Sequence, residues 1–269
     1  MLKNMYIHTG YVTYGSHYDA LETLFTLNTE TVNVHTVAIF GVAPLLFLVA
    51  NVMCIPGFFS SSAIHGGVWL SGIVFALIGC VATMAYHMFC QIPDWYHFYS
   101  ALDLFGITLA LIAFALGLIS VDYAYPLLSF FLPGEADSQS HLASHATLLA
   151  VVCSVVGLAI ARIRVAIARE SPVLLLLLNV AIGLFVTLPC YLSLRGSESL
   201  RASLTVCLLL GGMTLYLVKI PERWVCFQSK TLDLIGNSHQ IWHVAYCLAF
   251  YTYFSDLIVH ALGPQVLWI

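Results

Sequence analysis

Residues 67–89 read GVWLSGIVFALIGCVATMAYHMF and contain no Asp, Glu, Lys or Arg. A helix of about 20 mostly apolar residues is long enough to cross the hydrocarbon core of a bilayer. The whole chain has the same character, because 61% of its 269 residues are hydrophobic and 8% are charged, with a mean hydropathy of +0.94. Soluble domains carry about 25% charged residues. The composition therefore excludes a soluble globular protein and predicts an all-α membrane protein.

Six further stretches have a comparable length and apolar character. Together they give seven predicted spans, at 36–55, 67–89, 98–120, 144–162, 172–193, 202–219 and 235–258. Helices are expected because no alternating ten-residue strands occur. Nucleic-acid binding is excluded, since the 9 Lys and Arg face 13 Asp and Glu and form no clustered basic surface. The prediction is a segment 1–35 in the cytosol or at the membrane surface, a seven-transmembrane helix bundle 36–258 and a short tail 259–269.

The distribution of positive charge predicts a cytosolic N-terminus. Cytosolic loops are enriched in Lys and Arg, and with seven spans the N-terminal side holds most of these residues. That side carries Lys3, Arg162, Arg164, Arg169, Lys219, Arg223 and Lys230, and the opposite side carries Arg195 and Arg201. Residues 16–35 mix apolar and acidic side chains, with helical spacing over the first part. We therefore expect a short amphipathic helix on the cytosolic membrane surface.

Few ionisable side chains fall inside the predicted spans, where such groups are rare and usually functional, and four of them form one set. His87 lies near the end of the second span, Asp103 near the start of the third, and His239 and His243 near the start of the seventh. In the predicted topology all four lie one or two turns inside the cytosolic boundary. The i, i+4 spacing of His239 and His243 places both rings on one helix face. A third imidazole from His87 would complete a three-histidine metal site.

Three histidine ligands and an open fourth position are typical of a catalytic zinc ion, which lowers the pKa of bound water to about 7. Asp103 would orient that water and take its proton. Thr83 lies four residues before His87, so its hydroxyl would support the site from the same helix face. A hydrogen-bonded network between helices without metal is an alternative. A proton relay or transporter is another, although the sequence shows no inverted repeat.

Other features are predicted to be structural. Gly211 and Gly212 permit close helix approach, and Pro44 is expected to kink its helix. The IPERW segment at 220–224 is interpreted as a turn between helices. The cysteines in apolar runs are predicted to be free packing residues rather than disulfides or zinc ligands.

Two blocks of the sequence resemble the progestin and adipoQ receptor family, within the wider group that includes haemolysin III proteins and alkaline ceramidases. TMAYHMFC at 83–90, followed by ALDLFGI at 101–107, is similar to the family's Ser-x3-His and Asp-x-x-Gly segments. Thr83 stands in place of the usual Ser and keeps the hydroxyl. IPERW at 220–224, followed by LDLIGNSHQIWH at 232–243, is similar to the family's Pro-Glu-Arg…Asp…Ser-His-Gln-x-x-His signature.

A third block joins TGY at 9–11 to NTETVNVHT at 28–36, and it is similar to the family's N-terminal motifs. The resemblance implies seven helices with the N-terminus inside and a zinc ion on the same three histidines, with Asp103 near the metal-bound water. It leaves two functions open. One is a ceramidase-like hydrolase that attacks the amide of ceramide or a related long-chain lipid. The other is a receptor or signalling scaffold in which zinc is structural and Asp103 is a candidate fourth ligand.

Overall fold

The computed structural model describes residues 5–54, 63–120, 197–224 and 230–262, together with positions 157 and 160. Every regular element in these residues is helical, in agreement with the predicted all-α class. Apart from those two positions, the predicted spans 144–162 and 172–193 lie outside the described residues. Two described helices are long and apolar enough to cross a membrane, Thr31–Cys54 with 24 residues and Leu70–Phe89 with 20. The helix Ser203–Val218 is also apolar but shorter.

The first long helix begins before the predicted span and contains a wide turn. Its elements are α2 (Thr31–Val37), the π-helical segment η1 (Ala38–Val42) and α3 (Ala43–Cys54). Pro44, for which the sequence predicts a kink, lacks the N–H that would donate to the carbonyl four residues earlier. The π turn directly before it offers the backbone a different hydrogen-bond pattern. A Cβ on Gly41 in this turn would lie 2.9 Å from the sulfur atoms of both Cys80 and Cys247.

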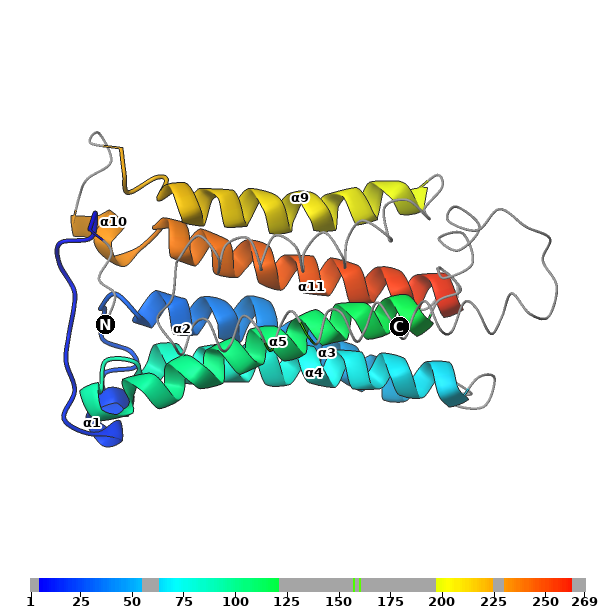
Figure 1. Cartoon of the computed structure of the whole chain (residues 1–269), viewed down its shortest axis with the longest axis horizontal. Coiled ribbons are helices and arrows are strands. Elements are labelled where there is room, and N and C mark those ends of the chain that lie inside the picture. The colour runs from blue at the N-terminus through cyan, green and yellow to red at the C-terminus, as the bar shows by residue number, and fades with distance from the viewer. Residues whose placement is uncertain are drawn as a thin grey trace. The chain divides into compact units, whose positions relative to one another are not determined.

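The next elements are α4 (Ala63–Phe89), the 3-10 turn η2 (Pro93–Trp95) and α5 (Tyr96–Ser120). Helices α4 and α5 end with the predicted spans and begin a few residues earlier. They run side by side (Figure 1) and pack closely at Gly106. A Cβ there would lie 2.8 Å from the Cβ of Ala82 and 2.9 Å from the carbonyl oxygen of Gly79. Only glycine permits this approach, which lies beside Thr83.

The last elements are α9 (Ser197–Val218), α10 (Lys230–Leu234) and α11 (Ser238–Leu262). Helix α9 lies along α11 (Figure 1), and the contact depends on Gly212. A Cβ on Gly212 would lie 2.7 Å from the Cβ of Ala245 and 3.2 Å from the Trp242 ring. No described atom lies within 4 Å of a Cβ built on Gly211. The predicted close approach is therefore confirmed at Gly212, whereas none of the described residues approaches Gly211 closely.

The N-terminal segment, residues 5–30, contacts both α10 and the residues just past the end of α4. Its helix α1 (His17–Glu22) has six residues and is capped by the Ser16 side chain, so the expected amphipathic helix is short. Before it, the chain runs from α10 to the end of α4 (Figure 1), where Thr9 N donates to Asp233 Oδ2 (2.8 Å) and Tyr14 N donates to Gln91 O (3.1 Å). After α1 comes a polar cap of four buried residues, Asn28, Thr29, Thr31 and Asn33. The expectation of a surface segment up to residue 35 misses this burial.

The chain divides into two compact units. One comprises Met1–Leu46, Leu77–Ile107 and Leu204–Tyr251 and contains every candidate site residue. The other comprises Phe47–Ala76, Thr108–Ser203 and Thr252–Ile269. Within this second unit, a Cβ on Gly72 would lie 3.2 Å from the Phe254 ring and 3.4 Å from the Ala113 carbonyl oxygen, so α4 approaches both α5 and α11 at Gly72.

Candidate metal centre

Helices α4 and α11 bring the three predicted histidines together. His87 lies in the last turn of α4, and His239 and His243 lie one turn apart at the start of α11. The ring centroids are 5.0 Å apart for His87 and His239, 4.6 Å for His87 and His243, and 4.5 Å for the α11 pair. Each imidazole offers a ligand atom within 4.8 Å of those of the other two. The sequence-based choice of these residues therefore corresponds to one cluster.

The start of α11 is fixed by the residues that precede and follow His239. Asn237 Oδ1 accepts from Gln240 N (3.2 Å), as an N-cap side chain does. Gln240 Oε1 accepts in return from Gly236 N (2.6 Å), and Gln240 Nε2 donates to Leu234 O (2.7 Å). These reciprocal bonds resemble a capping box. They join the end of α10 to the first turn of α11 and so place His239.

A second restraint on α11 comes from the IPERW segment, which is more than the simple turn that the sequence predicts. Glu222 is 1% exposed, and its carboxylate accepts from Ser238 N (2.8 Å) and from Ser238 Oγ (2.5 Å). A negative charge at a helix N-terminus is favourable, because the unpaired N–H groups and the helix dipole are positive there. Glu222 thus holds the residue directly before His239.

Asp103 and Thr83 form a separate pair beside the histidines. Thr83 Oγ1 donates to Asp103 Oδ1 at 2.6 Å, which links α4 to α5 one turn before His87. Asp103 is half-buried and is not a member of the close group of ligand atoms. The hydrogen bond agrees with the prediction that the Thr83 hydroxyl supports the site. It places Asp103 near the cluster without making it a fourth ligand.

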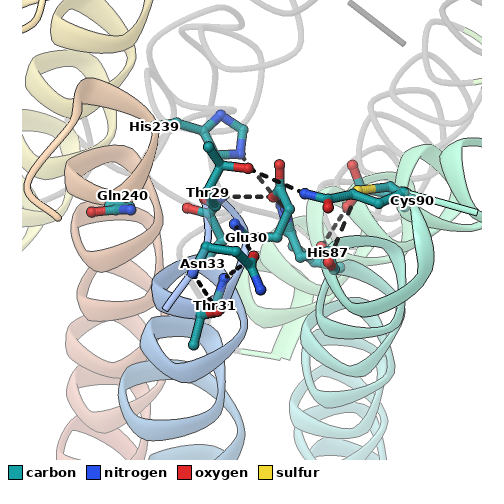
Figure 2. A network of polar contacts seen from close by, with 12 residues as sticks. Thr29, Glu30, Thr31, Asn33, His87, Cys90, His239 and Gln240 are labelled. Carbon is teal, nitrogen blue, oxygen red and sulfur yellow. Dashed lines mark hydrogen bonds and ion pairs between the residues drawn. The ribbon is translucent and has the colours of Figure 1, made fainter. Parts of the chain in front are cut away.

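Glu30 is a site residue that the sequence analysis missed. Its Oε2 lies 2.7 Å from His87 Nδ1 and accepts a hydrogen bond from Asn33 Nδ2 at 2.8 Å, and Figure 2 shows the carboxylate beside the imidazole. Burial would raise the pKa of Glu30, but the bonds with His87 and Asn33 outweigh it and lower the pKa below its ordinary value. The group is therefore a carboxylate at neutral pH.

The polar cap holds Glu30 in place. Asn28 Oδ1 accepts from the backbone N–H groups of Glu30 (2.8 Å) and Thr31 (3.1 Å), as an Asx turn does. Thr29 Oγ1 accepts from Gln91 Nε2 (3.1 Å), just past α4. These bonds satisfy buried polar groups that would otherwise be costly. The NTETVN motif at the start of an apolar helix is the sequence feature that could have indicated Glu30 as a site residue. Its polarity instead favoured a location at the surface.

Aromatic rings and a small pocket complete the surroundings. Tyr86 packs edge-on against His87 with centroids 4.9 Å apart, and Tyr216 packs against His239 at 5.1 Å. A small pocket of about 10 Å³ has Glu30, His87 and Leu24 among its lining residues. This volume is about that needed for one water molecule beside the Glu30 and His87 pair.

The donor set of the cluster fits a metal ion. His87 Nε2 and His239 Nε2 lie 3.3 Å apart, and His243 Nδ1 is buried without a hydrogen-bond partner in the described part of the chain. Buried polar atoms without partners are costly, and a shared cation would satisfy nitrogen lone pairs from all three rings. Neutral imidazole is a ligand for zinc and for several other transition metals. Among the described residues, no other His, Cys, Asp or Glu joins this group.

Comparison with known proteins agrees with the geometry. The chain matches the family described as haemolysin-III related over residues 25–254, a range that includes Glu30, the Thr83 and Asp103 pair and all three histidines. A search of curated proteins gave no match. The family match covers most of the chain, and the resemblance noted in the sequence lies in the same residues, apart from TGY at 9–11. The chain belongs to the haemolysin-III-related family of membrane proteins, which includes the progestin and adipoQ receptors.

Proposed function

We propose that this protein is a zinc-dependent hydrolase that cleaves the amide of a long-chain lipid such as ceramide. The observation that carries the proposal is the three-histidine cluster with no fourth ligand from the described residues. His87, His239 and His243 would hold the ion and leave a position for water. When bound, zinc would supply a Lewis acid and lower the pKa of the water that it binds to about 7.

The chain's own residues supply the proton transfers. Thr83 Oγ1 donates to one oxygen of Asp103, which restrains the carboxylate beside the cluster. Asp103 would accept the proton released by the attacking water and pass it to the nitrogen of the departing amine, as a general base and then a general acid. Its role depends on staying outside the metal ligands, because a coordinated carboxylate is less available to take a proton.

The position of the cluster favours a lipid substrate. His87 lies at the end of a helix long enough to span a membrane, Leu70–Phe89, and His239 lies in the first turn of α11. A site one turn from the helix ends corresponds to the boundary between headgroups and hydrocarbon. The amide of a ceramide-like lipid lies near this depth, and its acyl chain would extend along the apolar helices.

The alternative is a receptor or scaffold in which zinc ties the helices together. Structural zinc sites almost always have four protein ligands, and Asp103 is the residue from which a fourth was expected. Its absence from the close group of ligand atoms favours the hydrolase. The two functions make different predictions for Asp103, because a scaffold would not need its proton transfer.

The test is hydrolysis of long-chain ceramide by purified full-length protein in detergent, with the released fatty acid measured by mass spectrometry. We expect His239→Ala to lose both zinc and turnover. Asp103→Asn should keep its zinc and lose about 10²–10⁴-fold in rate, the range typical of a general acid–base group. The exposed His8 provides a matched control, since His8→Ala should match the wild type. Full turnover in His239→Ala would end the hydrolase proposal, and a zinc-loaded wild type without turnover would favour the scaffold.

A further inference from the structure

We propose that Glu30 is a positioning residue that sets the metal affinity of the three-histidine cluster. Its carboxylate would hold the proton of His87 on Nδ1, so that the lone pair of Nε2 points to the metal. This inference rests on the metal site of the proposed function. It goes further by giving a role to a residue on α2's N-terminal boundary, far in sequence from the three ligands.

The hydrogen-bond geometry defines the orientation of His87. A neutral imidazole has one donor nitrogen and one acceptor nitrogen. Glu30 Oε2 lies 2.7 Å from His87 Nδ1, and a carboxylate accepts only, so the proton belongs on Nδ1. The other nitrogen, Nε2, then keeps its lone pair on the side that faces His239 Nε2 at 3.3 Å. A carboxylate partner of this kind fixes the ring and increases the basicity of a ligating histidine.

The three imidazoles differ in their hydrogen-bond partners. His87 is bound to the half-buried carboxylate of Glu30, whereas His243 Nδ1 has no hydrogen-bond partner among the described residues. The polar bond that the structure gives His239 runs from its Nε2 to His87. Among the three, His87 is therefore the ligand with a described anionic partner, and we expect the greatest loss of affinity when that partner is removed.

Glu30 is itself held firmly enough to position another group. The same Oε2 accepts from Asn33 Nδ2 at 2.8 Å, and Asn28 Oδ1 accepts from the Glu30 backbone N–H at 2.8 Å. Both the main chain and the carboxylate are thus restrained at the start of α2. The polar cap transmits this restraint across to the last turn of α4, where His87 lies.

Charge balance supports the same role. A divalent ion on three neutral imidazoles brings two positive charges into a poorly solvated site, where uncompensated charge is costly. The structure places the Glu30 carboxylate against one of the ligands, 2.7 Å from His87 Nδ1. Removal of that carboxylate, as in Glu30→Gln, takes a negative charge away from beside the ion.

Three variants of the full-length protein separate positioning from folding. Glu30→Gln keeps an acceptor oxygen at the same reach and loses the charge, whereas Glu30→Ala loses both. Asp233→Asn is the matched control, because the carboxylate of Asp233 is buried but accepts from Thr9 and the His8 backbone rather than from an imidazole. Zinc affinity is measured by competition with a chromogenic chelator. The visible spectrum of the Co²⁺-loaded protein reports the ligand field independently of activity.

We expect zinc to bind about 10-fold more weakly to Glu30→Gln and about 100-fold more weakly to Glu30→Ala, the range for loss of such a partner. The Co²⁺ bands should shift in Glu30→Gln and superimpose on the wild type in Asp233→Asn. Wild-type affinity and an unchanged Co²⁺ spectrum in both Glu30 variants would overturn the inference and leave the metal site intact. Equal losses in Asp233→Asn and Glu30→Gln would overturn it in favour of general destabilisation. A wild type that binds neither ion would overturn the proposed function as well.

Discussion

Replacing Gly106 by alanine should push α5 away from α4 beside Asp103. The added Cβ would lie 2.8 Å from the Ala82 Cβ and 2.9 Å from the Gly79 carbonyl oxygen, whereas carbon atoms in contact are about 3.5–4.0 Å apart. Neither neighbour has a flexible end that can move aside. The two helices must therefore separate locally by about 1 Å.

The free energy of unfolding should fall. Overpacking of this kind costs about 1–3 kcal/mol, and the higher helix propensity of alanine returns about 0.5–1 kcal/mol. The net loss, up to about 2.5 kcal/mol, corresponds to a melting temperature up to about 10 °C lower. Asp103 lies one turn before Gly106, so it moves with the backbone. A displacement of 1 Å at a reacting group costs about 100-fold in rate.

The assay is thermal unfolding in detergent combined with ceramide turnover. Gly211→Ala is the matched control, since it makes the same change in α9 where no described atom lies within 4 Å of the new Cβ. That control should keep full activity and melt at or slightly above the wild-type temperature. If Gly106→Ala behaves like Gly211→Ala in both measurements, the close contact between α4 and α5 is wrong.

Three further changes test the surroundings of the cluster. Thr83→Val removes the hydroxyl that donates to Asp103, so the rate of ceramide turnover should fall about 10-fold or more. Thr83→Ser keeps the hydroxyl and should stay near the wild-type rate. Equal rates in the two variants would contradict the pairing. Glu222→Gln should lower the melting temperature, because the buried Glu222 carboxylate accepts two hydrogen bonds from Ser238. Changing it should cost about 1–3 kcal/mol of unfolding free energy. An unchanged melting curve would contradict the role of Glu222 in holding the start of α11. Gly212→Ala should destabilise the contact with α11, and hydrogen exchange in α9 should rise in comparison with Gly211→Ala.

The sequence could predict the features that follow from hydropathy and helical spacing. The apolar run that ends in His87 is long enough to define α4, and the spacing of His239 and His243 defines one face of α11. Because the predicted topology places the end of α4 and the starts of α5 and α11 on the same side, the three histidines and Asp103 could be grouped without a structure. The start of the first long helix was missed, since Thr31 and Asn33 are polar. Their burial depends on hydrogen bonds of Thr31 with Asn28 and of Asn33 with Glu30.

The remaining parts of the site depend on contacts that no local pattern encodes. Glu30 and His87 are 57 residues apart, and no spacing rule connects a carboxylate before one helix to an imidazole at the end of another. Glu222 lies in a charged segment between helices, where solvation is the ordinary expectation. Its burial is explained only by the helix N-terminus at Ser238 that it meets in three dimensions.

The central claim is that His87 of α4 and the two histidines of α11 hold one metal ion. Its most direct test is the metal content of full-length protein purified without chelator, for the wild type, His87→Ala, His243→Ala and the control His8→Ala. We predict one zinc ion per chain in the wild type and in His8→Ala. His87→Ala and His243→Ala should each lose most of the metal. Full zinc content in His87→Ala, or no bound metal in the wild type, would contradict the account.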